Sequence, residues 1–187
     1  MISRLAPATG KLLISEPFMD DPNFTRSVVL LTEHGEGGTL GFVINHPSLL
    51  VVKDLISDFE GADFPVYYGG PVATDTLHFI HRCPDKIIDG EEVGKGIYWG
   101  GNFEALKALI AQDAISNTEV KFFVGYSGWG VEQLKSEMEG NTWIVSDQYD
   151  SDIVFSDSEE QLWRDVIIHL GPKYAHISNF PQNPSLN

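Results

Sequence analysis

The chain of 187 residues has one cysteine, Cys83, so it cannot form an internal disulfide bond. Such sparse cysteine usage is typical of proteins in a reducing compartment. No apolar run approaches the roughly 18 residues of a membrane-spanning helix. The first 15 residues also lack the continuous apolar segment of a signal peptide. We therefore expect a cytoplasmic protein that makes no membrane contact.

Positive charge is scarce as well. The chain has 12 Lys and Arg residues against 27 Asp and Glu residues, which gives a formal net charge of −15. The cationic residues are spread along the chain without a run. Binding to nucleic acid normally depends on clustered Lys and Arg that neutralise phosphates. The acidic composition therefore predicts no direct contact with DNA or RNA.

Familiar catalytic and metal-binding motifs are missing. The sequence contains no His-x-x-x-His or Cys-x-x-Cys pair and no Gly-x-Ser-x-Gly nucleophile elbow. The segment "HFIHRC" at 78–83 brings two histidines and the cysteine together. Side chains alternate along a strand, so His81 and Cys83 share one face while His78 lies on the other. We expect hydrogen-bonded histidines here, with no metal and no cofactor.

A glycine-rich stretch, "GYSGWGVEQLKSEM" at 125–138, follows an apolar segment. A dinucleotide loop has the order Gly-x-Gly-x-x-Gly, whereas these glycines run Gly-x-x-Gly-x-Gly, and Gln133 stands where the third glycine would be. No lysine follows, as a P-loop requires. The stretch predicts a strand-to-helix corner in which Tyr126 and Trp129 pack onto neighbouring elements, and a nucleotide loop is the minority alternative.

Apolar patterning predicts the regular elements. We expect strands at 11–15, 27–34, 39–45, 64–70, 76–83, 96–99, 119–126 and 141–147. We expect helices at 49–59, 103–112, 131–139 and 158–172. Asn102 is a good N-cap for the second helix, and Ser156 or Ser158 for the last, which Gly171 and Pro172 end.

The order of these elements predicts the fold class. Strands occur in consecutive groups rather than in steady alternation with helices, which favours an α+β fold. "GEGG" suits the turn of an antiparallel hairpin, and the glycine pairs at 37–38, 69–70 and 100–101 suit sharp corners. We expect a single compact domain over 1–187, with a curved, barrel-like, mostly antiparallel sheet flanked by three or four helices. A polar leader at 1–9 and a docked tail at 173–187 complete it.

Polar residues in "TEHGEGGTLGFVINHPS" are the first binding candidates. Glu33 and His34 lie near the hairpin turn, whereas Asn45 and His46 lie at the far end of the second strand, so the four need not form one site. For these four residues a structural role is favoured over a binding role. The full set of candidate ligand- or partner-binding residues is Glu33, His34, Asn45, His81, Tyr126 and Trp129.

Several segments together resemble one known family. "FTRSVVLLTEHGEGGTLGFVINHP", "YYGGPV", "LHFIHR", "GYSGWGVEQLKSEMEGNTWIV" and "NFPQNPSLN" are similar to the AlgH/YqgE-like family of bacterial proteins, from about Gly10 to the C-terminus. The resemblance implies a compact α+β fold with a curved antiparallel sheet. The family is largely uncharacterised, carries the label of a transcriptional regulator and has no recognised catalytic residue.

The resemblance also selects individual positions. The matching residues are Glu33, His34, Gly41, Asn45, Pro47, Gly69, Gly70, Pro71, His81, Gly125, Tyr126, Gly128, Trp129, Gln133, Leu134 and Trp143. Two positions depart from the pattern, because Glu132 stands where relatives tend to have glycine and Lys135 where they tend to have glutamate. A negative side chain at Glu132 disfavours an anionic ligand at the start of that helix.

Three functional hypotheses follow. We expect a non-enzymatic cytoplasmic protein that acts through a protein partner or a small ligand, in regulation. One alternative is an enzyme whose site is built across the sheet from His34, Asn45 and His81. Another is a transcriptional regulator that binds DNA directly, which the net charge of −15 disfavours.

Overall fold

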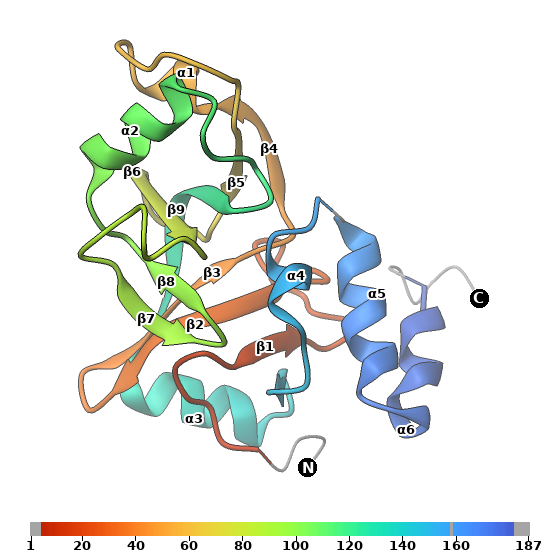
Figure 1. The fold of residues 1–187 in the computed structure, drawn as a ribbon. Coiled ribbons are helices and arrows are strands. Elements are labelled where there is room, and N and C mark those ends of the chain that lie inside the picture. Colours follow the sequence, from red (N-terminus) through yellow and green to blue (C-terminus); the bar gives the residue numbers. More distant parts are fainter. Residues whose placement is uncertain (1–4, 158, 182–187) are drawn as a thin grey trace.

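A computed structural model describes residues 5–157 and 159–181. In these residues ten strands form one curled sheet in the order β10-β1-β2-β3-β9-β6-β8-β7, with β4 and β5 attached beside this path (Figure 1). The strands are β1 (Leu12–Ser15), β2 (Val28–Gly35), β3 (Gly38–Val43), β4 (Pro47–Val51), β5 (Pro65–Tyr68), β6 (Val72–His81), β7 (Glu91–Gly94), β8 (Ile97–Trp99), β9 (Val120–Trp129) and β10 (Trp143–Ser146). Apart from the parallel pair of β5 with β9, the described strands pair antiparallel. The predicted fold class is confirmed.

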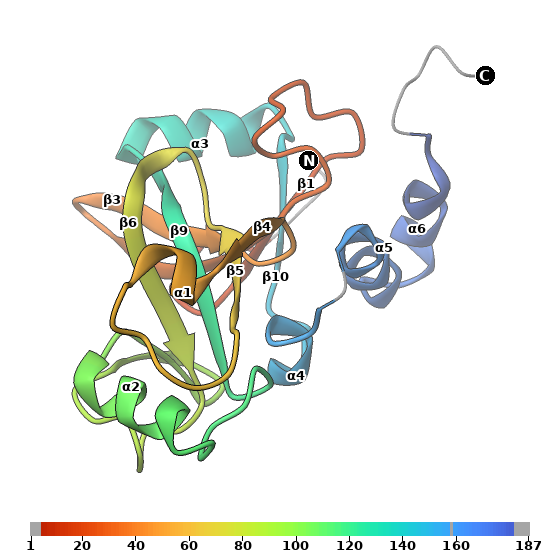
Figure 2. The same cartoon turned by 90° about the horizontal axis from the view of Figure 1, so that it is seen from above.

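Three longer helices pack against this sheet: α2 (Phe103–Ala111), α3 (Val131–Glu139) and α5 (Glu160–His169). Single turns form α1 (Val52–Leu55), α4 (Ser151–Val154) and α6 (Pro172–Ala175), and a 3-10 helix, η1, spans His176–Asn179. Figure 2 shows α5 and α6 side by side, on the opposite side of the molecule from α2. Among the described residues, no helix has the length and apolar character that crossing a bilayer requires.

Local sequence signals account for many of these elements. The β2–β3 hairpin forms at the predicted turn, where Gly35 pairs with Gly38. Asn102 caps α2 as predicted, because its Oδ1 accepts a hydrogen bond of 2.8 Å from the backbone N of Ala105. Leu106 and Ile110, four residues apart on one face of α2, are buried.

The predicted helix at 49–59 is wrong. Residues 47–51 form β4, which pairs antiparallel with β5, and only 52–55 make a helical turn. The Oγ of Ser48 donates a 2.6 Å hydrogen bond to the carbonyl of Val66, so the segment is held to its neighbour as a strand. A short apolar run has no periodicity that separates strand from helix. Here the conformation is set by pairing with a strand about 15 residues later in the chain.

The predicted strand-to-helix corner forms later than expected: the strand predicted to end at 126 continues as β9 through Trp129, and the chain turns at Gly130 into α3. The same strand changes partners along its length. Residues 120–126 pair with β6 and 122–124 also with β5, whereas 127–129 pair with β3. At the change, Gly125 has φ +68, and a Cβ atom there would lie 2.5 Å from the carbonyl oxygen of Gly70. Glycine is needed at this bend because of both its backbone angle and the space.

The capping of α5 differs from the prediction. Its N-cap residue is Glu159, which makes no side-chain cap. Ser156 does not serve, because its Oγ donates to the carbonyl of Ile153, and Ser158 lies outside the described residues. The strand β7 and the short helices α4 and α6 were not predicted.

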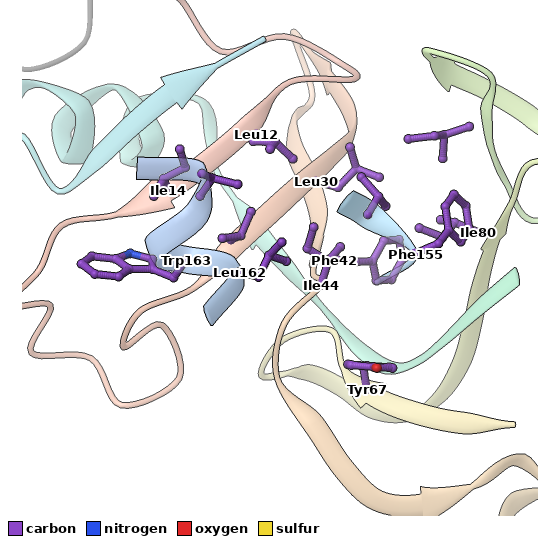
Figure 3. Close-up of a cluster of buried hydrophobic side chains, with 14 of the residues drawn as sticks. Leu12, Ile14, Leu30, Phe42, Ile44, Tyr67, Ile80, Phe155, Leu162 and Trp163 are labelled. Carbon is purple, nitrogen blue, oxygen red and sulfur yellow. The ribbon is translucent and has the colours of Figure 1, made fainter. Parts of the chain in front are cut away.

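The core has three parts. The largest joins one face of the sheet to α5, and Figure 3 shows Leu162 and Trp163 of α5 beside Ile14 of β1. The indole of Trp163 is fully buried and donates a 3.0 Å hydrogen bond to the carbonyl of Ser15. The other two parts lie beneath α2 and α3. Burial of the apolar faces of these helices is the main source of their stability.

The tail packs on α5 as far as it is described. Tyr174 and Ile177 contact the largest core cluster. Residues 182–187 of the predicted tail and 1–4 of the predicted leader lie outside the described residues.

A buried lysine ties α4 to the sheet. Lys121 of β9 is 4% exposed, and its Nζ donates to the carbonyls of Val154 (3.1 Å) and Ser156 (2.9 Å). The ring of Tyr67 lies 4.0 Å from the same nitrogen. Burial lowers the pKa of Lys121 to about 7, against a smaller opposing effect of the Asp157 charge. Lys121 is therefore largely neutral above neutral pH in the folded protein.

The bend in β9 yields the first prediction. Replacing Gly125 with alanine combines a positive φ with a close backbone contact, and we expect it to lower the free energy of unfolding by about 2–5 kcal/mol. The matched control is Gly130→Ala, where φ is −66° and no atom lies within 4 Å of the added Cβ, and where we expect a loss of no more than about 1 kcal/mol. Urea unfolding measures both, and equal losses would contradict the assigned role of Gly125.

The lowered pKa of Lys121 yields the second prediction. Below pH 7 the amine is protonated in both states; between pH 7 and about 10 it is protonated mainly in the unfolded chain, which then binds more protons. The free energy of unfolding should therefore rise with pH in this window, by at most about 1.4 kcal/mol per pH unit from this group. Comparison with Lys121→Met by urea unfolding isolates the effect, and parallel pH profiles would refute it. The window ends near pH 10, where tyrosine titrates in the unfolded chain.

Candidate functional site

The tip of the β2–β3 hairpin and the end of β9 enclose a pocket of about 440 Å³, here called the hairpin pocket. It is lined by residues 33–40 together with Tyr126, Gly128 and Trp129. Four of the six candidate residues from the sequence line it: Glu33, His34, Tyr126 and Trp129. The sequence placed the first two near the turn but did not bring β9 beside them.

Strand register places these residues side by side, with their side chains divided between the two faces of the sheet. Thr39 of β3 lies opposite both His34 and Trp129, and Leu40 lies opposite both Glu33 and Gly128. These are two cross-strand rows on opposite faces of the sheet. The hairpin tip can approach β9 closely because Gly38, with φ +122, has no side chain. A Cβ atom there would lie 2.6 Å from the carbonyl oxygen of Trp129.

The two aromatic residues that line the pocket differ in exposure and in how firmly they are held. Trp129 is 4% exposed, and its Nε1 donates a 2.9 Å hydrogen bond to Glu137 of α3. The same carboxylate accepts a 2.7 Å hydrogen bond from Nε1 of Trp143, so the indole of Trp129 is fixed as part of the wall. Tyr126 is half-buried and lies over Gly128, where an added Cβ would be 3.5 Å from the tyrosine ring. The ring of Tyr126 is the more accessible of the two.

Polar groups give the hairpin pocket an acidic character. Glu33 and Glu36 are exposed, and neither forms an ion pair with any residue that the structure describes. The residues that line the pocket include no Lys or Arg. His34 is held by a 2.7 Å hydrogen bond between its Nδ1 and the Oγ1 of Thr39. The two carboxylates are therefore available to a cationic group.

Asn45 lies elsewhere, in a second pocket of about 420 Å³. Its side chain is almost fully buried, and its Oδ1 accepts a 2.8 Å hydrogen bond from the backbone N of Val28. Its Nδ2 donates to the carbonyls of Arg26 (2.9 Å) and Glu159 (3.2 Å). With its hydrogen-bonding groups taken up by the backbone, Asn45 ties the start of α5 to the β2–β3 hairpin.

His81 lines neither pocket. It is fully buried, stacks on Tyr98 with 5.6 Å between ring centroids, and accepts a 3.2 Å hydrogen bond at Nδ1 from the backbone N of Cys83. Burial lowers the pKa of His81, so the ring is neutral near pH 7. His34, Asn45 and His81 therefore lie in three separate environments, and the geometry gives no support to an enzyme site that would need all three together.

The thiol of Cys83 is poorly suited to nucleophilic attack. Its Sγ donates to Oε1 of Glu119 at 3.2 Å. Burial, and secondly the Glu119 carboxylate, raise the pKa of Cys83 to about 11. The thiolate is the reactive form, so this cysteine is protonated and weakly reactive at neutral pH. Within the described ranges, no three His, Cys, Asp or Glu residues are placed to hold a metal ion.

Some residues of both pockets escaped the sequence. Glu36 is in the turn, and Arg26 is a lone cation in an irregular segment. Glu137, which holds the indole of Trp129 from outside the pocket, is one of many acidic positions. No local pattern distinguishes them. Only the strand register and the docking of α3 and α5 bring them to the sites.

Comparison with known proteins agrees with this structure. The AlgH-like family model matches residues 12–175. A UPF0301 protein of Bacteroides thetaiotaomicron is 41% identical over 186 residues, which cover 99% of this chain and 94% of the relative. A UPF0301 protein of Chlorobaculum tepidum is 40% identical over 178 residues and 95% of each chain.

Solved structures share the fold. The solution structure of the AlgH protein of Pseudomonas aeruginosa superposes with a TM-score of 0.71 at 28% identity, covering 96% of this chain and 98% of that one. A crystal structure of a Corynebacterium diphtheriae protein gives 0.76 at 22% identity, with 95% of each chain covered. The resemblance seen in the sequence motifs is thereby confirmed, and the chain belongs to the largely uncharacterised AlgH-like family.

Proposed function

We propose that this protein works by binding rather than by catalysis, and that the hairpin pocket is its binding site for a positively charged group. The group belongs to a small molecule or to a side chain of a partner protein. The observation that carries the proposal is a pocket of about 440 Å³ that Glu33, His34, Tyr126 and Trp129 all line, the first and third from one face of the sheet and the other two from the opposite face. Its lining contains no Lys or Arg.

The chemistry of the pocket supports a cationic ligand. The carboxylates of Glu33 and Glu36 attract an ammonium or guanidinium group and accept its hydrogen bonds. The face of Tyr126 adds a cation–π contact. The rigid wall of Trp129, held through Glu137, lowers the ordering cost of binding.

The same chemistry bears on the alternatives. Uncompensated carboxylates repel phosphates, so the acidic lining supports regulation through a protein or small-molecule contact rather than through DNA. A catalytic role would need a nucleophile or a general base aimed at a shared space. His34 is engaged with Thr39, and Cys83 lies outside this pocket. We place this binding function in the cytoplasm, as the single cysteine suggests.

The proposal yields a third prediction, tested with spermidine and with a lysine-rich peptide as probes. We expect saturable binding by isothermal titration calorimetry that weakens with added salt. Glu33→Gln and Glu36→Gln should each weaken it several-fold. The matched control is Glu132→Gln, which removes the same charge from a side chain on α3 that is 83% exposed and outside the pocket. Equal effects of all three variants would show a general charge effect and refute the site.

A fourth prediction concerns Tyr126. Tyr126→Phe keeps the aromatic face and should retain affinity for the same probes, whereas the affinity of Tyr126→Ala should be several-fold lower. Unfolding measurements on both variants exclude loss of the fold as the cause. If Tyr126→Ala binds as tightly as the unmodified protein, the ring has no part in recognition.

A further inference from the structure

The second pocket has in its wall a buried arginine whose hydrogen-bonding groups are incompletely used. Arg26 is 3% exposed. Its Nη1 donates to Oε1 of Glu160 at 2.6 Å, and its Nη2 donates to the carbonyl of Phe180. Its Nε has no acceptor among the residues that the structure describes and is shielded from solvent. A buried N–H without a partner is rare in folded proteins and costs stability.

The unused Nε–H donor of Arg26 belongs to an edge of the guanidinium group with a defined geometry. The N–H of Nε and one N–H of Nη2 lie on the same edge of a guanidinium group and point in the same direction. Two oxygens of a carboxylate or phosphate match this edge. In Arg26, Nη2 donates to the single carbonyl oxygen of Phe180, whereas Nε has no acceptor within the described residues.

We propose that this edge of Arg26 is a binding site for the oxyanion of a small carboxylate or phosphate ligand. The ligand enters the second pocket and displaces the carbonyl of Phe180, and its two oxygens accept from both Nε and Nη2. The site is separate from the hairpin pocket and takes a ligand group of the opposite charge. Phe180 acts as an internal competitor that occupies the arginine when no ligand is bound.

The contacts of Phe180 allow this exchange. Its ring stacks on Phe18 with 5.5 Å between centroids and meets His176 at 5.9 Å. Phe18 is 38% exposed, so this anchoring is near the surface. Phe180 follows the last described helical turn, η1, and moving its carbonyl breaks no strand pairing. The exchange leaves the sheet intact.

Charges around the pocket permit an anion. Glu160 also accepts from Nη2 of Arg164 at 3.1 Å, so its carboxylate keeps a counterion if Arg26 turns to a ligand. The start of α5, without a capping side chain, adds the positive end of a ten-residue helix. Burial lowers the pKa of His46, which keeps that ring neutral near pH 7. Of the carboxylates that line this pocket, only the exposed one of Glu159 has no ion pair within the described ranges, and its charge opposes the binding of an anion.

The direct test follows the Nε–H signal of Arg26 by nitrogen-15 NMR during separate titrations with sodium acetate and sodium phosphate. We expect a saturable shift at about millimolar probe, together with shifts of the backbone amides around Phe180. A response to acetate alone assigns a carboxylate ligand, and one to phosphate alone a phosphate ligand; a response to both supports the shared oxyanion chemistry. If neither probe moves the Nε–H signal, the proposal is wrong.

Variants of the full chain sharpen the test. Phe180→Ala weakens the internal competitor, and Glu159→Gln removes the opposing charge, so each should tighten binding several-fold. Ile168→Ala, at a half-exposed position on α5 outside these contacts, is the control and should change nothing. Arg26→Lys removes the two-donor edge and should abolish the shifts of the backbone amides around Phe180. If the Arg26→Lys variant fails to fold, the Phe180 and Glu159 variants still test the proposal. Unchanged affinity in both would overturn the proposal.

Discussion

The contact between the bend of β9 and the corner that joins β5 to β6 holds the two halves of the sheet together. Gly69, Gly70 and Gly125 meet there so closely that a Cβ atom on any of them would lie within 2.5 Å of a backbone oxygen. This close approach lets one strand pair with β5 and β6 in its first half and with β3 in its second. Without the bend, the second half of β9 would not reach the hairpin.

The hairpin pocket is a consequence of that path. Once β9 runs beside β3, Tyr126 and Trp129 stand next to a turn that begins 90 residues earlier in the chain. The carboxylate of Glu137, from the helix that follows, accepts from two indoles and holds one wall still. A site formed between a hairpin tip and a clamped strand end is pre-organised, which is what a binding pocket requires to avoid ordering costs.

Sequence patterns predicted the parts of the fold that depend on near neighbours. The hairpin at "GEGG" and the cap at Asn102 were correct because each is decided within a few residues. The extension of β9 was missed because its glycines indicated a turn, whereas pairing with β3, over 80 residues away, kept the segment extended. The candidates Glu33 and Tyr126 could be selected separately, but their meeting needs the register. The bond from Arg26 to Phe180 spans 154 residues and left no local signal.

The two pockets lie at opposite ends of β3, one at Gly38 and the other at Asn45. The six residues of β3 between them span about 20 Å. Charges in water are screened beyond about 8 Å at physiological salt, so each pocket responds to its own side chains rather than to the net charge. The glutamates at the hairpin tip lack ion pairs in the described structure, whereas Glu160 at the other end is shared between Arg26 and Arg164. An acidic chain can therefore place carboxylates without ion pairs near one end of a strand and a buried arginine, whose Nε–H has no acceptor within the described residues, near the other.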